Sequence, residues 1–227
     1  MTKRSYVTTR FAVMVLVVGM ACSGEQEPVR VTAAVQQDSR IDQLPDQVRA
    51  MLAFQDEMRK LWEDHIVWTR GFIISTAHSL PDAGPTTQRL LANQVDIGNA
   101  FRRFYGDAIA DQLTQLLTDH ILIAAQLVTA AKAGDGDAVA TASARWTANA
   151  DDIARLWSTI NPRSWPFDEM QEHMRTHLAL TLDEAVLRLG GNFAGDVAKY
   201  DEVHAAILDM ADMLSSGIIE QFPGKFH

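Results

Sequence analysis

Two stretches of the chain share one pattern: residues 89–101, RLLANQVDIGNAF, and residues 145–157, RWTANADDIARLW. Both carry Arg, Ala-Asn, Asp-Ile and a large aromatic residue at the same places, and they lie 56 residues apart. Apolar residues recur in both at intervals of three and four, which is typical of an amphipathic helix. A repeat of this length indicates that one supersecondary unit is used more than once.

Histidines recur with nearly the same period. His65, His120 and His177 each lie in a short motif (DHI, DHI and THL), at spacings of 55 and 57 residues. His204 occupies the place that asparagine holds in the two quoted stretches, 55 residues after Asn149. We therefore predict a helical hairpin of about 56 residues, present three times.

The helical periodicity continues along the whole chain from residue 44. We expect six helices, over residues 45–79, 86–105, 107–133, 137–160, 167–189 and 194–221, separated by Gly, Pro or Asn. No convincing strand pattern is present, and short loops favour antiparallel neighbours. The expected fold of residues 44–227 is all-α, a six-helix bundle built from three tandem helical hairpins.

The N-terminal residues 1–21 have the features of an export signal. Lys3, Arg4 and Arg10 precede or flank an apolar run over residues 11–18, which is too short to span a membrane. Cys22, the only cysteine, follows directly and resembles the lipidated cysteine of a lipobox. Gly19-Met20-Ala21 departs from the usual lipobox sequence and also suits ordinary signal peptidase, which would release a secreted protein.

We expect residues 22–43 to form a flexible tether. This stretch is polar and has no sustained period. The predicted location is therefore the cell envelope, with the membrane as a partner through lipid on Cys22, facing the periplasm or extracytoplasmic side. An envelope protein is a further expected partner.

The charge balance and the cysteine count exclude several classes of function. The chain has 29 acidic against 20 basic residues, a net charge of −9, which disfavours binding to nucleic acid. One cysteine rules out an internal disulfide and a Cys-ligated zinc site in the folded part. Phosphate loops, nucleotide-binding glycine motifs, Gly-x-Ser-x-Gly and His-Glu-x-x-His are absent from the sequence, so no catalytic residue is predicted.

The recurring histidines lie on the apolar faces of the predicted helices and indicate a polar layer inside the bundle. Because imidazole is the commonest ligand of transition metals, we expect a site for zinc, copper or iron. The candidate ligands are His65, His120, His173, His177, His204 and Glu184, and the candidate outer residues are Asn93, Asp96, Asn149 and Asp152.

A structural interpretation of the same layer stays open. Buried His and Asn side chains also set helix register by bonding to one another. On that interpretation the protein is a non-catalytic structural or protein-interaction lipoprotein.

Four segments carry a resemblance to known proteins: WEDHIVWTR, RLLANQVDIGNAF, RWTANADDIARLW and YDEVHAAILDMADMLSSGIIEQFP. Together they resemble a family of small bacterial all-helical proteins with no established activity. The resemblance covers about residues 61–222. It implies an all-helical fold and assigns no functional residue.

Overall fold

Six α-helices make up most of the chain that the computed structural model describes, residues 43–227. They are α2 (Asp46–Ala77), α3 (Ala83–Tyr105), α4 (Asp107–Ala133), α5 (Gly136–Ile160), α6 (Phe167–Leu189) and α7 (Phe193–Gln221), followed by a short 3₁₀ turn, η1 (Pro223–Lys225). No strand occurs in this range, so the predicted all-helical class is confirmed. The expected export signal, Cys22 and nearly all of the tether lie outside the described residues.

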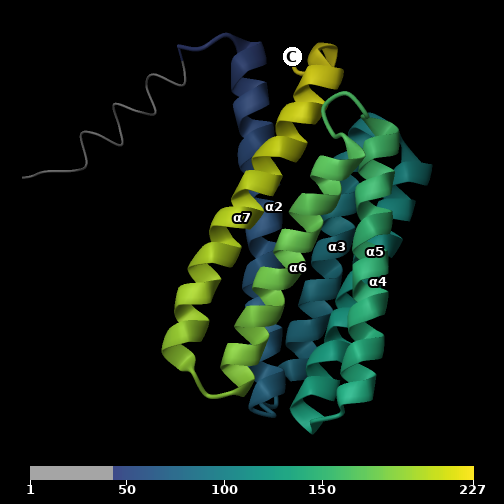
Figure 1. Cartoon of the computed structure of the whole chain (residues 1–227). Helices are drawn as coiled ribbons and strands as arrows, with labels where there is room; N and C mark the ends of the chain where they lie inside the picture. The colour runs from purple at the N-terminus through teal and green to yellow at the C-terminus, as the bar shows by residue number, and fades with distance from the viewer. Residues whose placement is uncertain (1–42) are drawn as a thin grey trace, which may run out of the picture. The chain divides into compact units, whose positions relative to one another are not determined.

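Each helix packs against the next along the chain, and α7 packs back against α2 to close a ring (Figure 1). The helices α2, α4 and α6 also contact one another. All three run in the same direction, with one antiparallel helix between each pair (Figure 1). The interior of Leu44–His227 is therefore formed where three parallel helices face each other.

Local sequence explains where the helices begin and end. Gly134 ends α4 in the left-handed conformation, with φ of 71°, which glycine adopts without steric cost. Asp135 and Asn192 cap α5 and α7, each accepting a backbone N–H three residues on. Helix α3 starts three residues earlier than predicted, because Pro85 falls in its first turn, where no intrahelical N–H bond is lost.

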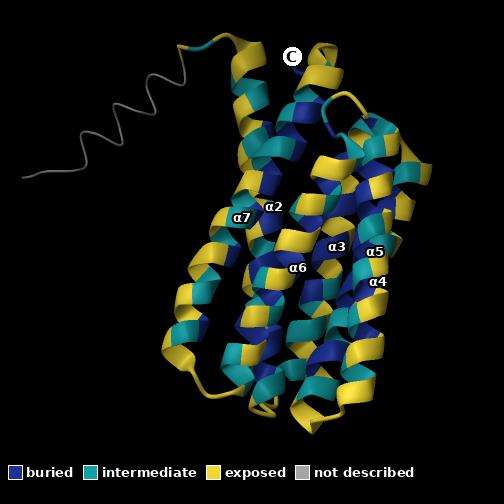
Figure 2. Cartoon of the chain, viewed as in Figure 1, coloured by how far each residue is buried: buried dark blue, intermediate teal, exposed yellow. Residues whose placement is uncertain are grey.

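Large apolar side chains fill the interior, as the inward faces in Figure 2 show. Trp157, Trp165 and Phe101 are fully buried and belong to one core cluster that spans the helices. Their burial removes the largest apolar surfaces from water, which is the main favourable contribution to folding.

Helix α4 is the one described helix long and apolar enough to cross a membrane by length and composition. Its apolar residues include Leu113, Leu117 and Leu127, which lie buried in the core cluster. Packing against four other helices accounts for this composition, since a core helix shares it with a membrane span.

Candidate functional site

The three parallel helices α2, α4 and α6 bring three histidines together in the interior. His65, His120 and His177 are 2%, 2% and 5% exposed. The ring centres of His65 and His177 lie 5.8 Å apart, and those of His120 and His177 lie 6.1 Å apart. We call these three residues the histidine cluster.

Asn149 of α5 determines which nitrogen of His120 carries the proton. Its Nδ2 donates to the carbonyl oxygen of Leu116 at 3.0 Å, so its Oδ1 faces Nδ1 of His120 at 2.8 Å. An amide oxygen accepts and cannot donate, so the His120 Nδ1 holds the hydrogen. The His120 Nε2 then presents a lone pair, and this buried atom has no partner within residues 43–227.

A different arrangement surrounds His65. Asn93 donates from Nδ2 to the carbonyl oxygen of Leu61 at 3.0 Å, as Asn149 does to Leu116. The next residue, Gln94, lies between Asn93 and the ring: its Nε2 donates to Leu90 O at 2.7 Å and is 3.3 Å from Nδ1 of His65. His65 Nδ1 therefore accepts, and its hydrogen is on Nε2.

His177 lacks a partner of this kind. His204 stands in α7 where the other units have asparagine, but it is half-exposed and pairs with Glu63 of α2 at 2.8 Å. The His177 Nδ1 is consequently buried with no hydrogen-bond partner in the described part of the chain. His177 is also the ring that lies close to both other imidazoles.

The cluster is uncharged near neutral pH. Burial lowers the pKa of His120 to about 3 and that of His177 to about 4. The His65 pKa is also well below its ordinary value, first because of burial and then because the other two imidazoles repel a positive charge. Neutral imidazoles keep a nitrogen lone pair that can accept a proton or bind a metal.

Tryptophans enclose the cluster. Trp62 stands edge-on to His65 with ring centres 5.8 Å apart, and Trp146 lies 5.1 Å from His120. Trp157 packs edge-on against Trp62 at 6.0 Å. These indoles keep bulk water away from the imidazoles, which strengthens any interaction that a ligand makes there.

The other residues predicted for a metal site lie elsewhere. His173 lines a surface pocket of about 390 Å³ together with Glu169, Glu172 and Asp209. Of the predicted outer residues, Asn93 and Asn149 contact the cluster as described, whereas Asp96 and Asp152 are exposed. Asp96 lies 3.5 Å from Arg89 in a surface ion pair.

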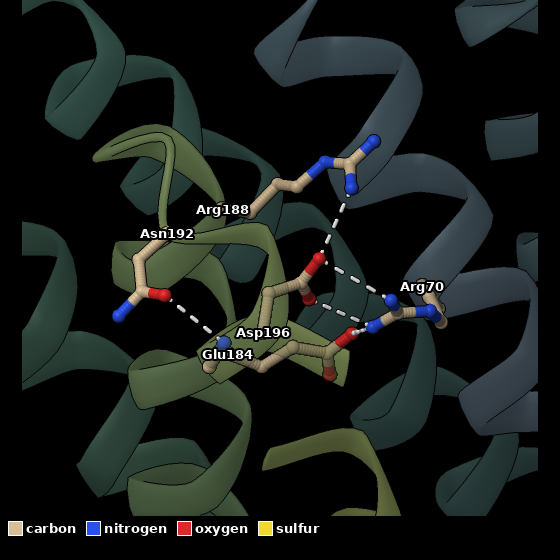
Figure 3. A network of polar contacts seen from close by, with 6 residues as sticks. Arg70, Glu184, Arg188, Asn192 and Asp196 are labelled. Atoms are coloured by element: carbon tan, nitrogen blue, oxygen red, sulfur yellow. Dashed lines mark hydrogen bonds and ion pairs between the residues drawn. The ribbon is translucent and has the colours of Figure 1, made fainter. Parts of the chain in front are cut away.

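Glu184 belongs to a separate ionic network between α2, α6 and α7 (Figure 3). Its Oε1 accepts from Arg70 at 2.6 Å, and Arg70 also donates to the fully buried Asp196 at 2.8 Å. Arg188 donates to the same Asp196 carboxylate at 3.1 Å. We expected Glu184 in the histidine layer, and the structure pairs it with Arg70 instead, because two buried carboxylates need cationic partners.

Sequence reasoning did not find Gln94, Arg70 or Asp196. Gln94 follows the repeated Ala-Asn pair at a place where the other copy has Ala150, and this difference was the available signal. Arg70 and Asp196 are 126 residues apart, and no spacing rule links them before the ring of helices closes.

The side chains as they stand form no ready metal site. Within residues 43–227, no group of three or more His, Cys, Asp or Glu side chains is arranged to hold a metal ion. No protein-family model matches the chain, and comparison with curated proteins and with solved structures likewise returns no match. The resemblance drawn from the sequence stays a prediction.

Proposed function

We propose that this is an exported helical-bundle protein whose histidine cluster binds a small ligand, a transition metal such as zinc, copper or iron. The observation that carries the proposal is the geometry of His120. Asn149 holds its Nδ1–H, and its Nε2 is buried, unprotonated and unpaired. Metal-binding histidines characteristically donate their other ring N–H to a fixed acceptor in this way.

The electrostatics of the cluster support the same ligand. A metal competes with protons for imidazole nitrogen, and the low pKa values of His120 and His177 remove that competition near neutral pH. With metal–nitrogen bonds of ~2.0 to 2.1 Å, imidazoles on one tetrahedral ion have ring centres roughly 5 Å apart. The observed 5.8 and 6.1 Å separations then require rotation of the rings, within the packing of the neighbouring tryptophans.

We infer that the domain consists of three tandem hairpins, α2–α3, α4–α5 and α6–α7. Two parallel contacts support this inference: Asn93 and Asn149 each donate, at 3.0 Å, to the carbonyl four residues before the histidine of the preceding helix. Such a repeat supplies one equivalent histidine on each of three parallel helices. A set of three imidazoles is also the protein ligand set of some zinc enzymes.

The proposed setting is the cell envelope, with a lipid on Cys22 tethering the domain through residues 22–43. This part of the proposal depends on the sequence alone. A transition-metal protein on the extracytoplasmic side would meet its metal outside the cell, and no cysteine in the bundle would be open to oxidation there.

A second candidate role is purely structural, with the histidine and asparagine side chains fixing helix packing. The contacts of Asn93 and Asn149 with backbone carbonyls favour it, since each satisfies a buried group on the neighbouring helix. A protein of this kind would act by contacting an envelope partner. Metal content separates the two roles.

The test is elemental analysis of the protein purified without a histidine tag, with thermal melts before and after chelation. Binding predicts near-stoichiometric zinc, copper or iron, and a lower melting temperature once the metal is removed. A metal-free protein that none of these ions stabilises would leave only the structural role.

Substitutions then identify the ligands. His120→Gln keeps a polar side chain of similar size and should abolish stoichiometric metal, and His177→Gln should do the same. The control is His78→Gln, because His78 is exposed at the end of α2. Full metal content in both cluster variants would contradict the assignment.

A further inference from the structure

A small cavity lies one helical turn beyond the histidine cluster. Thr69, Ala124 and Thr181, which stand four residues after the three histidines, all line it. The remaining wall comes from apolar side chains, among them Leu127 and Val128. Its volume is about 20 Å³.

Size limits what this cavity can hold. A water molecule needs ~10 to 15 Å³ of such volume, so about 20 Å³ admits one molecule slightly larger than water. A cofactor or a metabolite is far too large, because ligand pockets for such molecules measure ~300 Å³ or more.

The chemistry of the wall selects among small molecules. A buried water is held by ~2 to 4 hydrogen bonds, and the surface of this cavity is apolar. The Thr69 hydroxyl already donates to the carbonyl oxygen of His65 at 2.7 Å. A neutral, apolar molecule loses nothing by leaving water for such a wall, and its transfer is favourable.

We propose that this cavity binds a neutral diatomic gas of the dioxygen class. The site would hold the gas about one helical turn from His65, His120 and His177, close to the place of the proposed metal. The inference goes beyond the proposed function and does not depend on it, since the cavity walls contain no proposed metal ligand.

The test uses the paramagnetism of dioxygen in nuclear magnetic resonance. The full chain, methyl-labelled and treated with a chelator, is compared under dioxygen and under nitrogen. Methyl groups of Ile73, Leu127 and Val128, which line the cavity, should relax several-fold faster under dioxygen, and the effect should saturate with pressure. Ile97 and Ile207, fully buried elsewhere in the core, serve as the reference.

A pair of neighbouring substitutions supplies the matched control. Ala124→Leu places three additional carbons into the cavity and should bring the relaxation of its methyl groups down to the reference level. Ala125→Leu makes the same change at an equally half-buried residue of α4 that does not line the cavity, and should preserve the effect.

Two results would overturn the proposal. One is equal relaxation enhancement at the cavity and reference methyl groups of the unsubstituted protein. The other is a long-lived water detected by cross-relaxation with Thr181, whose hydroxyl is buried without a partner within the described residues. Because the protein is metal-free throughout, a failure of metal binding in the earlier test leaves both results readable.

Discussion

At the scale of single residues, side-chain amides decide how each buried imidazole is protonated. Asn149 gives His120 an acceptor, whereas Gln94 gives His65 a donor, so the two rings carry their hydrogens on different nitrogens. His177 has neither, because His204 pairs with Glu63 at the surface. Three equivalent positions in the sequence thus have three different chemical states.

Asn149→Ala should lower the free energy of unfolding by about 1 to 3 kcal/mol, because it leaves the His120 N–H and the Leu116 carbonyl unpaired inside the protein. Asn93→Ala should cost less, since Asn93 bonds to Leu61 but not to His65. Urea unfolding of both variants measures the difference. Asn99→Ala, at an exposed residue, is the control, and equal stability of all three variants would contradict the contacts described.

At the scale of helices, sequence and structure agree closely. Helices α4 and α6 begin and end at the predicted residues, because Gly106, Gly134, Pro166 and Gly190 mark those ends. How closely two helices approach was not predictable from periodicity. At Gly98, a side-chain carbon would lie 1.9 Å from Thr114 Oγ1 and 3.1 Å from the Ala110 carbonyl oxygen, so α3 and α4 meet where only glycine fits.

Gly98→Ala should therefore destabilise the protein, by roughly 1 to 3 kcal/mol, because α3 and α4 must move apart. Gly136→Ala is the matched control: it lies at the start of α5 with open space around it, and should be neutral or stabilising by ~0.4 to 1 kcal/mol. Thermal melts of the two variants check the sign. Recovery of part of the lost stability in Gly98→Ala with Thr114→Ala would identify the Thr114 contact as the cause.

At the scale of the whole molecule, the two buried polar groups give opposite dependences of stability on pH. The histidines have folded pKa values below 6.5, so their contribution is complete above that pH and is lost as pH falls toward 4 and 3. Burial raises the pKa of Glu184 to about 7, above its ordinary 4.5, so the proton on Glu184 adds stability that is lost as pH rises through 7.

Between pH 6.5 and 4, we expect a net loss of stability on acidification, because three imidazoles oppose a single carboxyl group. Urea unfolding at several pH values in this range measures the slope. His120→Gln removes one of the titrating groups and should make the slope shallower, whereas His78→Gln should leave it unchanged. An identical slope in all three proteins would show that the cluster does not titrate as described.

The sequence alone determined the helical class, the six helices and the inward place of His65, His120 and His177. These features depend on local rules, namely apolar periodicity and the residues that end helices. The tertiary structure decided which of the predicted ligands meet. It brought three histidines together, left His173 and His204 near the surface, and gave Glu184 to Arg70. The physical reason is that a helical face specifies burial but not the partner across the interior, which depends on how the ring of six helices closes.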